Sequence, residues 1–226
     1  APDNKLVWLS LADVLKELGE LEAALIATNK ALQVDDNLAL AHLIKGELLG
    51  SLERRNEAVV ALQAALKCNP RLSAARHRLG NLYAELGRDD DAIEQLKTAY
   101  RLNPLSSNSL LLLGRVYARL GDHEAALREY SAAVEVDPKC ALAHAGMGES
   151  YLAINDLQNA IHKFTVAANV DAKHVDSHVS LGRIYLGQAR FSEAAEWFRS
   201  ALQIDPQNPE VEELLRNAES QCAPRD

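Results

Sequence analysis

The sequence predicts an all-α protein built from repeated pairs of antiparallel helices, and three observations support this fold class. Alanine and leucine, which favour helices, dominate the 226 residues. Glycine (11) and proline (7) are scarce and aromatic residues make up only 5%, which disfavours turn-rich β folds. Finally, glycine recurs at intervals of 34 residues, at Gly46, Gly80, Gly114, Gly148 and Gly182.

Other residue types repeat with the same period. Tyrosine recurs at Tyr83, Tyr117, Tyr151 and Tyr185. One alanine series is Ala24, Ala58, Ala92, Ala126, Ala160 and Ala194, and a second is Ala31, Ala65, Ala99, Ala133, Ala167 and Ala201. No residue is inserted or deleted across six units, which run 5–38, 39–72, 73–106, 107–140, 141–174 and 175–208.

Each unit is expected to fold as a first helix, a turn and a second helix. In the third unit, Leu79, Leu82 and Leu86 have the spacing of one apolar helix face. Ile93 and Leu96 belong to the apolar face of a second helix. Between the helices, Gly87 suits a left-handed residue that ends a helix, as Gly19 and Gly121 do in other units. Acidic residues follow, such as Glu20 and Asp122, and we expect them to cap the next helix.

Small residues are expected where the two helices touch, and proline where the second helix ends. Gly80 and Ala92 occupy the predicted contact, where larger side chains would separate the axes. Pro104 and its equivalents lack the N–H group that a helix needs. Residues 209–222 form one further helix with Val211, Leu214 and Leu215 on its apolar side. This segment is either a polar cap on the array or the first half of a seventh repeat.

The unit resembles the tetratricopeptide repeat, whose pattern combines Leu-Gly, Tyr, two alanines, an aromatic residue and Pro at fixed spacing. The sixth unit matches it at Leu181, Gly182, Tyr185, Ala194, Phe198, Ala201 and Pro206. Departures are local, such as Ala12 for Gly, Leu15 for Tyr and Asp36 for Pro in the first unit, and Ala172 for Pro in the fifth. The resemblance implies a single α-solenoid over residues 1–226, a right-handed superhelix of stacked helix pairs.

The resemblance further implies a concave groove, lined by the second, fifth, ninth, twelfth and thirteenth residues of each unit, in which a peptide or protein segment lies. Candidate peptide-binding residues from these positions are His77, Asn81, Leu111, Arg115, Arg119, Glu149 and Arg183. The N-terminal half of the groove is expected to be acidic, through Asp13, Glu17, Glu47 and Glu85. The C-terminal half is more basic, which predicts a ligand with an acidic part near Arg115, Arg119 and Arg183.

Two ligand-binding motifs known from other tetratricopeptide repeat proteins are absent. The carboxylate clamp that captures chaperone C-termini needs Lys, Asn and Arg at set positions of three consecutive units. Starting from the third unit those positions hold His77, Asn81, Leu112, Leu142 and Gly146, of which only Asn81 matches. The asparagine ladder of the Ser/Thr-modifying glycosyltransferase superhelix is also missing. Trp197 occupies a position that is otherwise polar or small, and is either an exposed hot spot or covered by the terminal helix or another chain.

No residues indicate catalysis, a cofactor or a metal ion. There is no phosphate loop, G-x-S-x-G or H-E-x-x-H sequence. His174 and His178 are four residues apart, but Asp171 lies across a turn from His174, so a shared metal is not expected. The net charge of −8 argues against nucleic acid and anionic lipid as partners. No run of about 20 apolar residues predicts insertion into a membrane.

We therefore expect a non-catalytic scaffold for protein–protein interaction and complex assembly. The alternative is a targeting or substrate-recruiting domain of a larger enzyme or of a secretion or assembly machine. Three distant cysteines favour reduced thiols and the cytoplasm. However, the sequence begins at Ala1 rather than Met, which leaves open a cleaved targeting segment or a parent protein elsewhere. Self-association is also left open.

Overall fold

The structure is a computed structural model that describes residues 4–222, so the ends of the predicted array at 1–3 and 223–226 lie outside the described residues. The helices of the described chain are α1 (Lys5–Glu17), α2 (Leu21–Val34), α3 (Ala39–Ser51), α4 (Arg55–Cys68), α5 (Ser73–Glu85), α6 (Asp89–Leu102), α7 (Ser107–Arg119), α8 (His123–Val136), α9 (Ala141–Ala153), α10 (Leu157–Val170), α11 (Val175–Gly187), α12 (Phe191–Ile204) and α13 (Pro209–Cys222).

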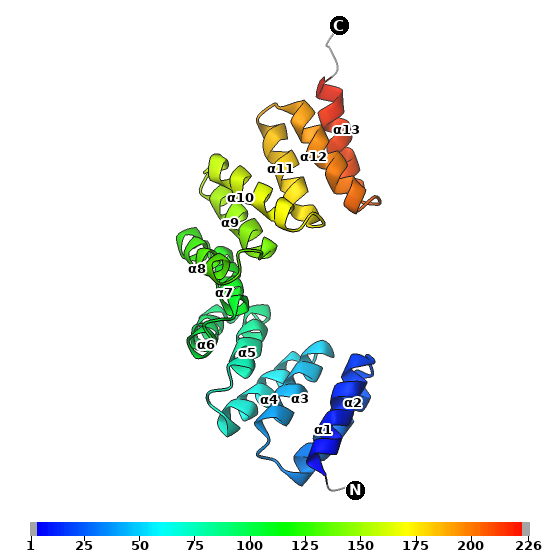
Figure 1. The fold of residues 1–226 in the computed structure, drawn as a ribbon, viewed down its shortest axis with the longest axis vertical. Coiled ribbons are helices and arrows are strands. Elements are labelled where there is room, and N and C mark those ends of the chain that lie inside the picture. The colour runs from blue at the N-terminus through cyan, green and yellow to red at the C-terminus, as the bar shows by residue number, and fades with distance from the viewer. Residues whose placement is uncertain (1–3, 223–226) are drawn as a thin grey trace. The chain divides into compact units, whose positions relative to one another are not determined.

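The helices form stacked pairs, which confirms the predicted fold class (Figure 1). The chain divides into two compact units, Ala1–Val116 and Tyr117–Asp226. In the first unit α1 packs on α2, α3 on α4 and α5 on α6, and α2 and α4 also contact the first helix of the next pair. The second unit repeats this with α9 on α10 and α11 on α12, and α13 packs on α12. The expected single array over the whole chain stays a prediction.

The repeated glycines lie where the two helices of a pair make their closest contact. A Cβ atom added to Gly80 would lie 2.6 Å from Cγ of Leu96 and 3.3 Å from the carbonyl oxygen of Ala92. The predicted proximity of Gly80 and Ala92 is therefore confirmed, and the large side chain of Leu96 accounts for most of the constraint. In the first pair, Ala12 replaces the glycine and Thr28 stands where Leu96 stands in the third. Both are fully buried, so a larger residue on α1 is matched by a smaller one on α2.

The turn within each pair contains one residue in the left-handed region. Gly87 has a φ of 71°, as the sequence predicted, and Glu53 and Ala189 adopt nearly the same value at the equivalent places without being glycine. The capping prediction holds only in part. The carboxylate of Asp122 accepts a hydrogen bond from the backbone N–H of Ala125 at 2.9 Å, whereas Glu20 makes no side-chain cap.

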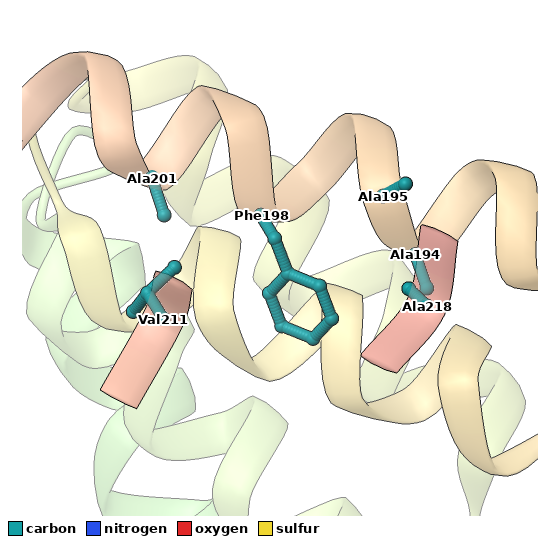
Figure 2. Close-up of a cluster of buried hydrophobic side chains, with 6 residues drawn as sticks. All are labelled: Ala194, Ala195, Phe198, Ala201, Val211 and Ala218. Carbon is teal, nitrogen blue, oxygen red and sulfur yellow. The ribbon is translucent and has the colours of Figure 1, made fainter. Parts of the chain in front are cut away.

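The core of the last pair is closed by α13. Figure 2 shows Phe198 of α12 between small residues, with Val211 and Ala218 of α13 on either side of its ring. Phe198 and Ala218 are fully buried, and Val211 is 1% exposed. The predicted terminal helix over 209–222 is therefore confirmed and is part of the core. The opposite side of α13 carries exposed Glu212, Arg216 and Glu219.

Candidate functional site

The first helices of the N-terminal unit line two neighbouring hollows. The larger has a volume of about 380 Å³ and is lined by residues of α1, α3 and α5, together with the start of α4. The smaller, of about 260 Å³, lies among α3, α5 and the start of α7. Several lining residues are the groove positions that the family resemblance indicated: Lys16, Glu47, Gly50, Ser51, Ala74, His77, Asn81, Glu85 and Asn108. The structure thus places the predicted groove positions of this unit in recessed surface.

Glu47 is the central charged residue of this surface, because it lines both hollows. Its carboxylate accepts a hydrogen bond from Nζ of Lys16 on α1 at 2.6 Å and another from Nε of Arg78 on α5 at 2.9 Å. Burial alone would raise the pKa of Glu47, but its hydrogen bonds and the charges of Lys16 and Arg78 outweigh burial and keep the pKa below its ordinary value. Glu47 therefore stays ionised at neutral pH and connects three consecutive first helices.

The predicted residues His77 and Asn81 both lie in these hollows. Nδ1 of His77 is 3.1 Å from Oγ of Ser109, which is hydrogen-bond distance. Burial, and secondarily the positive charge of Arg78, lowers the pKa of His77, so the ring is neutral at pH 7. Nδ2 of Asn81 donates to Oε1 of Glu85 at 2.7 Å. Asn81 shares the larger hollow with the apolar side chains of Leu62 and Leu82, whereas His77 lines the smaller one.

The expected acidity of the N-terminal groove is wrong for the larger hollow. Its lining includes Lys16, Arg55 and Arg78 as well as Glu47, Glu53 and Glu85, so the formal charges balance. Arg55 pairs with Glu53 and also approaches Glu85, with Nε 3.5 Å from Oε2. The sequence prediction considered only the second, fifth, ninth, twelfth and thirteenth residues of each unit. Arg78, the sixth residue of its unit, and Arg55, at the start of a second helix, also reach this surface.

The remaining candidate residues are distributed over both units. Leu111 is half-buried and Arg115 is exposed on α7 within the N-terminal unit. Arg119, Glu149 and Arg183 are exposed in the C-terminal unit. Arg183 forms an ion pair with Glu210 of α13. Because the units are described separately, a common site for Arg115, Arg119 and Arg183 stays a prediction.

Trp197 is half-buried rather than exposed. Its ring lies 5.5 Å from the ring of His178, and it packs at the edge of the core cluster around Phe164 and Leu181. Burial lowers the pKa of His178, whose neutral ring suits this apolar contact. His178 of α11 thus covers part of the Trp197 ring, and a role of Trp197 in binding stays a prediction.

The two histidines that were weighed as metal ligands have other roles. Nδ1 of His174 accepts a hydrogen bond from the backbone N–H of Ser177 and so caps α11, while His178 faces Trp197. Across residues 4–222, no three His, Cys, Asp or Glu side chains gather closely enough to hold a metal ion. In the same part of the chain, no helix has the length and hydrophobicity required to cross a bilayer.

Comparison with known proteins identifies the repeat along most of the chain. Family models described as tetratricopeptide repeat match residues 7–38, 61–94, 111–172 and 146–209, and one described as TPR repeat matches residues 80–121. No curated protein sequence matches the chain.

Several solved structures share the fold at low sequence identity. PilW, a widely conserved type IV pilus biogenesis factor, has a TM-score of 0.83 at 18% identity, covering 93% of this chain and 98% of its own. PilF of Pseudomonas aeruginosa has a TM-score of 0.81 at 18% identity, covering 94% and 97%. YrrB, a TPR protein with an unusual peptide-binding site, has a TM-score of 0.65 at 22% identity, covering 86% and 98%. At these identities the likeness concerns the fold alone.

Proposed function

The chain belongs to the tetratricopeptide repeat family, whose members commonly mediate protein–protein interactions, and we propose that it is a non-catalytic scaffold that binds an extended peptide segment in the hollows of its N-terminal unit. The observation that carries the proposal is the pair of adjoining hollows on the first-helix face. They are open, lined by polar and apolar side chains, and share Glu47 and Arg78 as a common wall. A surface with these properties suits an extended chain with alternating side chains.

The chemistry of the lining indicates what such a segment would offer. Asn81 and Ser51 carry polar groups that can bond to a peptide backbone, and Leu62 and Leu82 supply an apolar floor. Since three basic and three acidic residues line the larger hollow, a strongly charged ligand gains little there. We therefore assign the predicted acidic part of the ligand to the neighbourhood of Arg115 and Arg119 on α7, where two exposed arginines occupy groove positions.

Photocrosslinking tests the location of the bound segment. A photoreactive amino acid replaces the exposed Ser51, which lines the larger hollow, and in a matched control it replaces the exposed Lys67 on the second helix α4. Both variants are irradiated in a cell lysate, and covalent partners are identified by mass spectrometry. We expect a reproducible partner at position 51 that is absent at position 67. The same partners at both positions, or partners at position 67 alone, would contradict binding in the hollows.

The captured partner then tests the acidic-segment hypothesis. We expect the double change Arg115→Ala and Arg119→Ala to weaken its affinity about tenfold or more, because removing two charged contacts costs about 1.4 kcal/mol or more. The matched control is Arg101→Ala with Arg128→Ala, which removes equal charge from exposed positions on the second helices α6 and α8. Equal affinities of the two double variants, measured by titration calorimetry, would exclude a specific role for Arg115 and Arg119.

A further inference from the structure

The second repeat, residues 39–72, carries a third hollow, between its own two helices α3 and α4. Its volume of about 390 Å³ lies in the range of roughly 300–1,000 Å³ that is typical of ligand pockets. None of its lining residues belongs to either hollow of the first-helix face. Leu49 and Ala61 are buried at its base, whereas Val60 at its edge is 66% exposed. The hollow is therefore large enough, and apolar enough at its base, to hold one aromatic side chain.

Two other repeats fill the equivalent place with a tryptophan of the chain itself. In the first repeat the fourth residue is Trp8, and Nζ of Lys30, the twenty-sixth residue, lies 4.4 Å from the centre of the indole ring. In the sixth repeat the fourth residue is His178, and its ring lies 5.5 Å from that of Trp197, the twenty-third residue. In both repeats an indole thus packs between the first and the second helix, with a cationic or imidazole group beside it.

The second repeat lacks the side chains that fill this place. Its twenty-third residue is Ala61 instead of a tryptophan, and its twenty-sixth is Ala64 instead of a lysine. Its fourth residue is His42, which lines the hollow and is equivalent to the histidine that contacts the indole in the sixth repeat. Equivalent positions of the repeats therefore hold an indole in two cases and a hollow in the second repeat.

A lysine also gives this hollow a positive charge. The seventh residue of the other five repeats is leucine or methionine: Leu11, Leu79, Leu113, Met147 and Leu181. In the second repeat it is Lys45, which is half-buried and lines the hollow. Glu57 at the rim is held by Arg54 through two hydrogen bonds of 2.7 Å, and within residues 4–222 Lys45 has no ion-pair partner of its own. An ammonium group in this place is complementary to the electron-rich face of an aromatic ring.

We propose that the hollow between α3 and α4 is a second protein-binding site, which receives a tryptophan side chain of a partner protein. The indole packs on Leu49 and Ala61 at the base. Its other contacts are the imidazole of His42, as in the sixth repeat, and the ammonium group of Lys45, as with the lysine of the first repeat. Aromatic side chains that enter such pockets dominate the affinity of many protein interfaces. A partner held here leaves the first-helix hollows open, because the lining residues differ.

Methyl NMR of the full chain, labelled at leucine and valine, tests the proposal with N-acetyl-tryptophanamide as the probe. We expect saturable shifts at the methyl groups of Leu49 and Val60. The ligand efficiency typical of small molecules predicts a Kd on the order of 0.1 mM for a probe of this size. N-acetyl-leucinamide is expected to bind about tenfold more weakly or worse, because it has no ring to meet the imidazole and the ammonium group.

A plugged variant tests the location of the probe. His42→Trp with Ala64→Lys gives the second repeat the pair of residues that fills the first, and should weaken probe binding about tenfold or more. Ala64→Leu fills the hollow by a smaller change and should act in the same direction if the double change alters the circular dichroism spectrum. The matched control is His162→Trp with Gln203→Lys, at exposed positions of α10 and α12, which should bind the probe as the wild type does.

Several results would overturn the proposal. They are the absence of saturable shifts up to about 10 mM probe, equal affinity for N-acetyl-leucinamide, and undiminished binding by the plugged variants. Shifts centred away from α3 and α4, or equal weakening by the control pair, would overturn it as well. Tighter binding of free tryptophan than of N-acetyl-tryptophanamide would assign the hollow to the amino acid and would likewise contradict a protein side chain as its ligand.

Discussion

Helices α1 and α13 occupy the same place in their repeats, and their outer surfaces differ in opposite ways. The surface of α1 where a preceding helix would pack carries Val7 and Val14, both more than half exposed. On α13 the corresponding surface is covered by α12 and fully used, through Val211 and Ala218. The surface where α13 would receive a second helix of its own is polar instead.

The difference shows how a repeat array is continued or ended. A second helix packs against the eighth residue of the first, which is Ala12 in α1 and glycine in the pairs that follow. In α13 that residue is Arg216, too large for the close contact that Gly182 makes with Phe198. The size of Arg216 favours a cap over the first half of a seventh repeat, and the choice between the two stays a prediction. Helix α1 keeps the apolar surface of an interior repeat, with Val7 and Val14 exposed.

The largest effect on stability is expected at the third residue of the first helix, which is Val7 in α1 and Val211 in α13. Val211→Asp is expected to destabilise the chain by about 4 kcal/mol or more, because it places a carboxylate in the core beside Phe198 without a partner. Val7→Asp makes the same change where the side chain is 54% exposed, and should alter stability of the monomer by less than about 0.5 kcal/mol. Denaturant unfolding at low protein concentration measures both. Similar losses for the two variants would contradict the contrast between the ends.

A smaller effect is expected where the helices of the last pair touch. Gly182→Ala places a Cβ atom 2.5 Å from Cε1 of Phe198, so the ring must shift, and we expect a loss of about 1–3 kcal/mol. Gly187→Ala is the matched control on the same helix, because an added Cβ meets no atom within 4 Å. The control should be neutral or stabilising by up to about 1 kcal/mol. Calorimetric melting curves measure both changes, and equal losses would show that the contact with Phe198 does not set the identity of residue 182.

The period of the sequence predicted the fold because each repeated residue type has one local cause. Left-handed backbone favours Gly87, close helix contact requires Gly80, and helix ends tolerate Pro104. The choice between a cap and a halved repeat at α13 stays a prediction. The side chain that excludes larger residues at a helix contact becomes evident only from packing, as with Leu96 opposite Gly80.

The candidate site was predicted less completely than the fold. His77 and Asn81, taken from equivalent positions of each repeat, line the two hollows, and their role in peptide binding stays a prediction. The groove positions did not predict the balanced charge of the larger hollow. Arg78 is the sixth residue of its unit, which is not a groove position, and it reaches Glu47 through its long side chain. The sequence left open an exposed Trp197 because the equivalent residues of the other repeats are polar or small, whereas His178 of the neighbouring helix packs against it. Contacts between columns depend on side-chain length and rotamer, which periodicity does not contain.

The smallest effect is expected at two ion pairs, one of α1 and one of α13. Lys16 of α1 pairs with Glu47, and Glu219 of α13 pairs with Arg199. Glu47→Gln should lower stability at pH 7 by about 1 kcal/mol, because it removes the charge that Lys16 and Arg78 share. Glu219→Gln removes the partner of Arg199, at 2.6 Å but with both side chains about half exposed, and should cost less than about 0.5 kcal/mol.

Acidification distinguishes a charge effect at Glu47 from a packing effect. The pKa of Glu47 is lower in the folded chain than the ordinary value of about 4.3, so its contribution is complete above that value and is lost as the pH falls through the folded pKa. The stability difference between wild type and Glu47→Gln should therefore be constant from pH 7 to about 5 and shrink at lower pH. Chemical unfolding at a series of pH values measures it. A difference that persists undiminished at pH 3 would show that Glu47 stabilises α1 by shape rather than by charge.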